Sequence, residues 1–287
     1  MVIRGIWSAV LTPIDRDCSP DAALAVPYYR GLLERGCDGI NLLGTTGEAM
    51  SFGAQQRLRF MEAIAASGLP MERVMAGTGA ASIADAVQLT RAAFACGFAA
   101  ALVMPPFFFR DATDDGVLAF FERLFARTNP PRDGVLLYNF PRMSGIAFRP
   151  ALVERLLEHF PEAIAGMKDS SNDAELQSEL LARHHGFAVL PGSESDLLAA
   201  KRRGVAGCIS GSVALWPELA AAVFEHGDER QDRELTEHRN SLDGLSFIPA
   251  VRRLVARERR EPAWERAMPP QESLTGDETA LLQREAR

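Results

Sequence analysis

The chain has 287 residues, 47% of them hydrophobic, which is enough for one large core. Its formal net charge of -7 argues against a nucleic-acid partner, because such a partner calls for a basic face. The sequence has no run of about 18 uncharged apolar residues that could cross a bilayer, and it begins without a secretory signal pattern. We therefore expect a soluble, cytoplasmic protein with no membrane partner.

Short apolar runs alternate with longer amphipathic segments up to residue 209. The eight apolar runs are residues 5–11, 39–43, 73–76, 99–104, 134–138, 163–167, 188–190 and 207–209. Between them, segments such as 22–34, 54–66, 83–95 and 150–159 carry apolar residues at helical spacing. This repeated order of strand and helix predicts an α/β fold, a closed (β/α)8 TIM barrel.

Helices alone follow the eighth run, over residues 217–226, 230–242 and 249–261, with a last short helix at 278–287. We therefore expect a barrel over residues 1–215 and a C-terminal helical extension over residues 216–287, packed on the barrel as one structural unit. An open doubly wound sheet shows the same rhythm. Its G-x-G-x-x-G fingerprint is missing after the first run, and Gly77-Thr78-Gly79 lacks the last glycine.

Neither the cysteines nor the histidines indicate a metal site. The five histidines fall on predicted helices or at helix ends, away from the carboxyl ends of the strands. The cysteines lie far apart, form no C-x-x-C pair and are expected to be reduced core residues: Cys18, Cys37, Cys96 and Cys208. We therefore expect no metal ion, and the absence of a G-x-S-x-G elbow leaves serine hydrolysis unsupported.

Polar segments directly after apolar runs are the candidates for chemistry, because the carboxyl ends of barrel strands meet on one face. Three such segments follow the second, fifth and sixth runs. They are Gly44-Thr45-Thr46-Gly47-Glu48, Tyr138-Asn139-Phe140-Pro141 and Lys168-Asp169-Ser170-Ser171.

Lys168 is one of two lysines in a chain with 31 Lys plus Arg, and it follows an apolar strand. A lysine amine, unlike a guanidinium, can be neutralised by burial and can then attack a carbonyl. Lys168 is therefore the candidate nucleophile, and the alternative is a lysine that reaches solvent or pairs with Asp169. Lys201 looks like the exposed end of a helix and is assigned no role.

The other two segments suggest how a substrate is held. The Gly44-Thr45-Thr46-Gly47 turn offers hydroxyls and free backbone N–H groups that suit a small anion, although a tight turn with a threonine cap has the same composition. Tyr138 is the only tyrosine predicted at a strand end. A phenol there can pass a proton if neighbouring hydroxyls complete the path, or it can simply pack.

Together these motifs resemble the dihydrodipicolinate synthase and N-acetylneuraminate lyase superfamily of class I aldolases, from about Gly5 to at least Trp216. The segments that carry the resemblance appear in the family's order. They are Thr12-Pro13, the Gly44-Thr45-Thr46-Gly47-Glu48 turn, Gly77-Thr78-Gly79, Tyr138-Asn139-x-Pro141, Gly166-x-Lys168 and Gly192-Ser193.

The resemblance implies a Schiff base between Lys168 and pyruvate or another 2-oxo acid, with proton transfer by Tyr138 and Thr45. It also implies that Thr46 and neighbouring amides, Gly47 among them, hold the carboxylate. No cofactor is expected, because the imine itself accepts the electron pair.

The resemblance further implies that the backbone carbonyl of Ile209 faces the site and that the protein is a homotetramer built from tight dimers. Two departures concern the substrate. Synthases of the family have a proton-relay tyrosine in a Pro-Tyr-Tyr element, and this chain has Phe108 in that place. They also have a substrate-binding arginine at the position of Met143, whereas the arginine of this chain, Arg142, lies one position earlier.

These departures count against a dihydrodipicolinate synthase. The segments Gly166-Met167-Lys168-Asp169-Ser170-Ser171 and Tyr138-Asn139-Phe140-Pro141 look more like family members that cleave or dehydrate a 2-keto-3-deoxy sugar acid or a hydroxy-oxo acid. In that case substrate hydroxyls would contact Arg142, Ser144, Ser193, Glu194 and Ser212. Dihydrodipicolinate synthase is the alternative within the family. A non-catalytic protein that binds a 2-oxo acid is an alternative of another class. A barrel enzyme that binds phosphate after its seventh and eighth strands is the last alternative.

Overall fold

The computed structural model describes residues 3–285, in which eight parallel strands form one sheet. The strands are β1 (Gly5–Ala9), β2 (Gly39–Leu42), β3 (Val74–Gly77), β4 (Ala100–Val103), β5 (Val135–Asn139), β6 (Ile164–Asp169), β7 (Ala188–Pro191) and β8 (Gly207–Ser210). Their order is β7-β6-β5-β4-β3-β2-β1-β8. The Ala206 amide, just before β8, donates to the Val189 carbonyl of β7 at 2.9 Å, so the two ends of the sheet meet.

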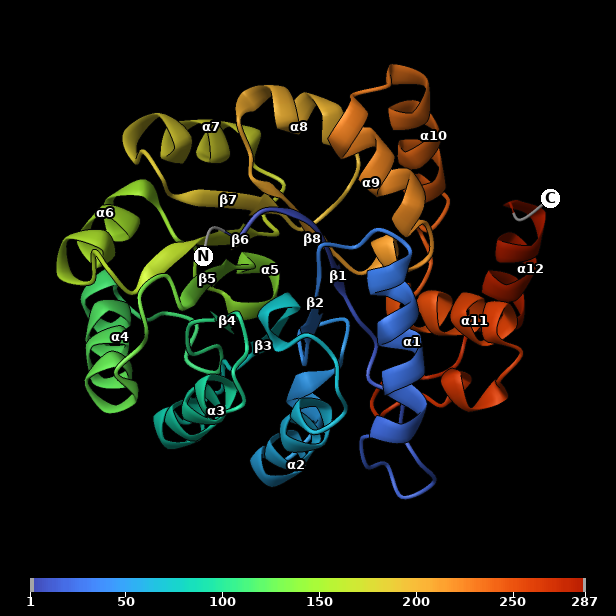
Figure 1. Ribbon diagram of the computed structural model, residues 1–287, viewed down its shortest axis with the longest axis horizontal. Helices are drawn as coiled ribbons and strands as arrows, with labels where there is room; N and C mark the ends of the chain where they lie inside the picture. The colour runs from blue at the N-terminus through green and yellow to red at the C-terminus, as the bar shows by residue number, and fades with distance from the viewer. Residues whose placement is uncertain (1–2, 286–287) are drawn as a thin grey trace.

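Helices surround this barrel, as Figure 1 shows. They are α1 (Ala22–Glu34), α2 (Ala54–Ala65), α3 (Ile83–Ala95), α4 (Asp114–Thr128), the short α5 (Pro141–Ser144), α6 (Pro150–His159), α7 (Ala174–Arg183) and α8 (Leu197–Arg203). Side-chain caps fix several of their first turns. Asp21, Ser82 and Thr113 each accept a hydrogen bond from a backbone N–H of the helix that follows.

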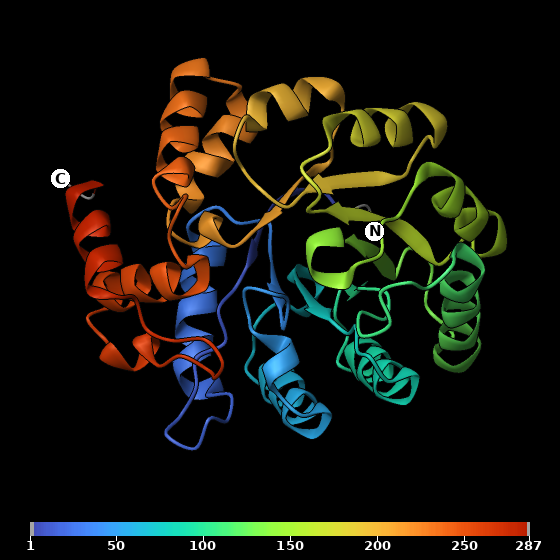
Figure 2. The same ribbon diagram turned by 180° about the vertical axis from the view of Figure 1, so that it is seen from behind.

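Four helices follow the barrel: α9 (Pro217–His226), α10 (Glu229–Asn240), α11 (Phe247–Arg259) and α12 (Gly276–Glu285). The chain between α11 and α12 returns to α1, where Trp264 packs edge-on against Tyr28 with ring centroids 4.8 Å apart. Arg35, at the end of α1, pairs with Glu258 of α11 at 2.7 Å. In both views α11 therefore lies beside α1, with α12 farther out (Figure 2).

The strands are buried on both faces, which explains their continuous apolar runs. One apolar cluster fills the barrel and includes Trp7, Met75, Leu102, Leu136 and Ile209. A larger cluster lies between the strands and the helices. No helix in the described residues is both long and apolar enough to cross a membrane.

The predicted barrel is confirmed, with strand ends shifted by one or two residues. The largest consequence concerns β6, which extends to Asp169, so Lys168 lies within the strand and not just after it. The predicted helices 22–34, 83–95, 150–159 and 217–226 have the observed bounds. The last helix begins at Gly276, two residues early, and the end of its predicted range, Arg287, lies outside the described residues.

Candidate active site

Lys168 and Tyr138 lie next to each other on β6 and β5, where they are paired in the sheet register. Both side chains are buried, with Lys168 4% exposed. The Lys168 Nζ lies 4.6 Å from the centroid of the Tyr138 ring. The amine is therefore held in a largely apolar space against an aromatic face, as a nucleophilic lysine requires.

The Tyr138 hydroxyl is in turn 3.1 Å from Thr45 Oγ1, and either oxygen can be the donor. Thr45 belongs to the turn after β2 and is only partly buried. Lys168, Tyr138 and Thr45 thus form one continuous set of contacts from the interior of the barrel to its mouth. The tertiary structure brings together all three residues expected to be catalytic.

The turn that follows β2 is closed by its own backbone. The Glu48 amide donates to the Thr45 carbonyl at 3.0 Å, and the Ala49 amide donates to the Gly44 carbonyl at 3.2 Å. The N–H groups of Thr46 and Gly47 donate to no acceptor among the described residues. A turn with free N–H groups and two threonine hydroxyls is suited to a carboxylate.

Thr46 faces the end of β8. A Cβ built on Gly211 would lie 2.7 Å from Thr46 Oγ1, so only a glycine permits this approach. Ile209 lies in the same region, fully buried among the residues that fill the barrel. Thr46, expected to hold the carboxylate, and Ile209, whose carbonyl is expected to face the site, are therefore both on the β2 to β8 side of the barrel.

Glu48 anchors the turn to the C-terminal extension through a buried ion pair with Arg252 of α11. Arg252 Nε donates to Glu48 Oε2 at 2.9 Å, and its Nη2 donates to the Thr12 carbonyl at 2.8 Å. Both side chains are almost fully buried. The other carboxylate oxygen, Glu48 Oε1, has no hydrogen-bond partner among the described residues.

The residues expected to contact substrate hydroxyls differ in burial and in their hydrogen bonds. Ser144 is fully buried, and its Oγ donates to the Ile146 carbonyl at 2.8 Å and accepts from the Ile146 amide at 3.1 Å. Its hydroxyl holds the loop after α5. Arg142 is exposed, and Ser193 Oγ accepts from the Ser195 amide at 3.2 Å. Among the described residues, neither Arg142 nor Ser193 makes a hydrogen bond or ion pair with Lys168, Tyr138 or Thr45.

A cleft of about 930 Å³, part of it open to solvent, reaches Thr45 and Tyr138 from outside. Its walls are mainly apolar and include Met50, Met104, Phe107, Met143 and Ile248. Lys168 does not itself line the cleft. Its amine lies behind Tyr138, which does line the cleft. A reactant entering the cleft would therefore meet the two hydroxyls before the amine.

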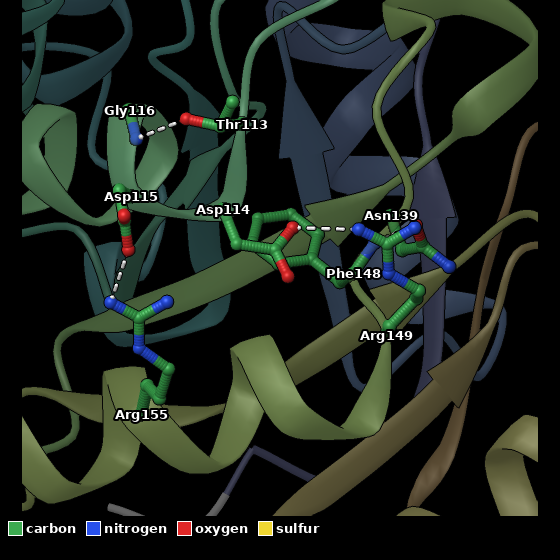
Figure 3. A network of polar contacts seen from close by, with 8 residues as sticks. All are labelled: Thr113, Asp114, Asp115, Gly116, Asn139, Phe148, Arg149 and Arg155. Atoms are coloured by element: carbon green, nitrogen blue, oxygen red, sulfur yellow. Dashed lines mark hydrogen bonds and ion pairs between the residues drawn. The ribbon is translucent and has the colours of Figure 1, made fainter.

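Asn139 and Asp169, the last residues of β5 and β6, are joined behind the site by a bond from Asn139 Nδ2 to Asp169 Oδ1 at 2.8 Å. The Phe148 amide donates to Asn139 Oδ1 at 3.0 Å. Figure 3 shows the adjoining contacts, in which Arg149 reaches Asp114 at 2.9 Å. This network fixes the strand ends that carry Tyr138 and Lys168, so Asp169 is not a partner of the lysine.

Two residues with a place in this region were not predicted from the sequence: Asn41 and Arg252. Glu194, which was expected to contact substrate hydroxyls, is fully buried, and both of its oxygens lack hydrogen-bond partners among the described residues. Asn41 could have been found from the sequence, because it is a polar amide within an otherwise apolar strand. Arg252 carried no signal, because it is one arginine of many on an amphipathic helix.

Comparison with known proteins places these features in a known group. The sequence profile of the Dihydrodipicolinate synthetase family matches residues 2–255. An uncharacterized DapA-like lyase from Chloroflexus aurantiacus is 35% identical over 255 residues, which cover 87% of this chain and 85% of that protein.

Two solved structures share the whole architecture. A dihydrodipicolinate synthase from Agrobacterium tumefaciens superposes with a TM-score of 0.92 at 29% identity, covering 99% of this chain and 98% of the other. A dihydrodipicolinate synthase from Acinetobacter baumannii, solved in complex with pyruvate, gives a TM-score of 0.84 at 25% identity and covers 99% of this chain and 97% of the other.

Proposed function

The chain belongs to the Dihydrodipicolinate synthetase family, a group of class I lyases, and from this membership we propose that Lys168 forms a Schiff base with a pyruvate-type 2-oxo acid. The observation that carries the proposal is the buried amine of Lys168 against Tyr138, whose hydroxyl meets Thr45 at 3.1 Å. The pyruvate complex of the Acinetobacter relative also supports a 2-oxo acid as the substrate.

In the proposed mechanism the Lys168 amine attacks the ketone carbon of the 2-oxo acid, and the resulting carbinolamine takes up a proton and loses water to give an iminium ion. When the C3–C4 bond breaks, C4 leaves as an aldehyde and the electron pair of the bond moves into the iminium to form an enamine. The Tyr138 and Thr45 hydroxyls carry the proton of the C4 hydroxyl to C3, and hydrolysis of the imine then releases pyruvate and the free amine. The free N–H groups of Thr46 and Gly47 hold the carboxylate throughout.

For the substrate we propose a 2-keto-3-deoxy sugar acid or a related hydroxy-oxo acid, which is cleaved or dehydrated. Glu194 supports this assignment. It follows the carboxyl end of β7, on the face of the barrel where the strand ends meet, and a buried carboxyl group without partners can accept hydrogen bonds from substrate hydroxyls. Phe108 has no hydroxyl to contribute to a proton relay. Dihydrodipicolinate synthesis is the second candidate, favoured by the activity for which the two solved relatives are named.

We also propose that the protein is a homotetramer. Large apolar side chains are exposed around the mouth of the site, among them Phe108 at 75%, Phe109 at 72% and Met50 at 50%. Such a patch is typical of a surface that another chain covers. Sedimentation of a single monomeric species at micromolar concentration would contradict the tetramer.

The test of the Schiff base is borohydride trapping with pyruvate, followed by intact mass and peptide mapping. We expect one reduced pyruvyl adduct on Lys168 in the wild type and none in Lys168→Ala. Lys201→Ala is the matched control, because Lys201 is the only other lysine and its Nζ donates to the Phe224 carbonyl on the outer surface. A folded wild type that gives no adduct with excess pyruvate would leave a non-catalytic binding protein as the better description.

A further inference from the structure

Asn41 has a polar side chain inside the barrel without a hydrogen-bond partner among the described residues. It is fully buried, and neither its Nδ2 nor its Oδ1 has a hydrogen-bond partner in the part of the chain that the structure describes. Buried amides are almost always hydrogen-bonded, and leaving one unsatisfied costs about 1–3 kcal/mol. The residue therefore needs a partner that is not part of the protein.

The sheet register shows that Asn41 points into the barrel. It pairs with Ala9 on β1 and with Met75 on β3, and both of these neighbours belong to the cluster that fills the barrel. Paired residues of neighbouring strands share a face, so Asn41 points the same way. It is the last inward-pointing residue of β2, as Lys168 is of β6.

The positions of these strands allow one ligand to meet both side chains. Alternate strands of a (β/α)8 barrel contribute to the same interior layers, and β2 and β6 are alternate strands on opposite sides. Lys168 and Asn41 therefore both point into the interior, each as the last inward-pointing residue of its strand.

The Asn41 amide also lies at the start of the turn that carries Thr45 and Thr46. A Cβ built on Gly44 would lie 2.6 Å from Asn41 Nδ2, closer than any real side chain permits. The glycine therefore leaves room for the Asn41 donor directly beneath the turn.

We propose that Asn41 is a substrate-binding residue whose Nδ2 donates a hydrogen bond to an oxygen of the 2-oxo acid held at Lys168. This inference rests on the proposed function, because it takes the ligand of Lys168 as the partner of the amide. An apolar residue would fit the surrounding Ala9, Met75 and Ile209 better in the absence of a ligand.

The experiment uses two variants and one control in the full chain. Asn41→Leu keeps the size but removes the donor, and Asn41→Asp replaces the donor with a group that repels a carboxylate. Thr128→Val is the matched control, since Thr128 is a buried polar residue of α4 whose Oγ1 donates to the Leu124 carbonyl far from the site. The pyruvate concentration that gives half-maximal trapping and the pyruvate-induced shift in melting temperature are both measured.

We expect Asn41→Leu to need at least about tenfold more pyruvate, the effect of losing one hydrogen bond to a charged group, and Asn41→Asp to need more still. The melting temperature of ligand-free Asn41→Leu should equal or exceed that of the wild type, because the unsatisfied amide is gone. Thr128→Val should require the same pyruvate concentration as the wild type.

Unchanged pyruvate dependence in a folded Asn41→Leu overturns the inference and leaves the Schiff base intact. A lower melting temperature with unchanged trapping also overturns it, since the amide then holds structural water. If both variants fail to fold, Asn41 is a determinant of the fold and the inference is likewise wrong. If the wild type forms no adduct, the Schiff base fails, and a pyruvate-induced melting shift that Asn41→Leu loses still supports the contact.

Discussion

Tyr138 differs from the other two tyrosines in what its hydroxyl contacts. Tyr29 donates to the Leu11 carbonyl at 2.7 Å, and Tyr28 is buried without a partner for its hydroxyl among the described residues. Burial raises the pKa of both phenols above the usual range, which keeps their protons in place. Only the Tyr138 hydroxyl meets another hydroxyl at the mouth of the barrel, that of Thr45.

Replacing Tyr138 with phenylalanine tests the proton path without requiring the true substrate. The enzyme should exchange the methyl protons of pyruvate in heavy water through the enamine, and NMR follows this exchange. We expect Tyr138→Phe to slow the exchange by about 10²-fold or more, the usual contribution of a general acid–base group, while equilibrium trapping persists. Tyr29→Phe is the control and should leave the exchange rate unchanged. Equal exchange rates in Tyr138→Phe and the wild type would remove Tyr138 from the mechanism.

Helix α11 lines the cleft with Ile248 and also supports the site from behind the turn after β2. Arg252 joins Glu48, at the end of the turn after β2, to the Thr12 carbonyl after β1. A buried ion pair contributes little net stability against an apolar pair, but removing one partner leaves an uncompensated charge. The C-terminal helices are therefore coupled to the turn, and not merely packed beside the barrel.

This coupling between α11 and the turn can be tested by substituting each residue of the Arg252–Glu48 ion pair. Arg252→Met should lower the free energy of unfolding by about 3–5 kcal/mol, because Glu48 stays buried and charged. Adding Glu48→Gln to Arg252→Met should restore part of that loss, and urea titration followed by circular dichroism measures both. A loss below about 1 kcal/mol for the single variant would show that the turn opens to solvent freely.

Over the whole molecule, buried thiols make stability depend on alkaline pH. Burial, with a smaller contribution from Asp38, raises the pKa of Cys37 to about 12, and burial raises the pKa of Cys208 well above its usual value. The unfolded chain releases these protons near pH 9, whereas the folded chain keeps them. Their stabilising effect is therefore complete below about pH 9 and is lost as pH rises toward 12, by about 1.4 kcal/mol per unit for each thiol.

Urea titrations at several pH values between 8 and 10.5 measure this loss. Cys37→Ala should show a shallower decrease above pH 9, because one of the two thiols no longer contributes. The buried tyrosines act in the same direction at higher pH, and they are common to both proteins, so the difference between the slopes isolates Cys37. Identical slopes would mean that Cys37 titrates normally in the folded state.

The sequence by itself determined the secondary-structure elements and pointed to Lys168 as the candidate nucleophile. Continuous apolar runs specify strands buried on both faces, and helical spacing specifies their cover, so the barrel and helices such as Ala22–Glu34 follow from local patterns. The chemistry of a lysine within an apolar strand singled out Lys168. These features are local, since backbone conformation and hydrophobic periodicity are properties of neighbouring residues.

Only the tertiary structure decided which side chains meet. Thr45 and Tyr138 are 93 positions apart, and Glu48 and Arg252 are 204 apart, so no local pattern joins them. Whether a polar residue is satisfied also depends on every neighbour in space, which is why Ser144 proved to hold a loop and Asn41 proved to lack a partner. A closed barrel brings the ends of distant strands to one face, and packing at that face settles each contact.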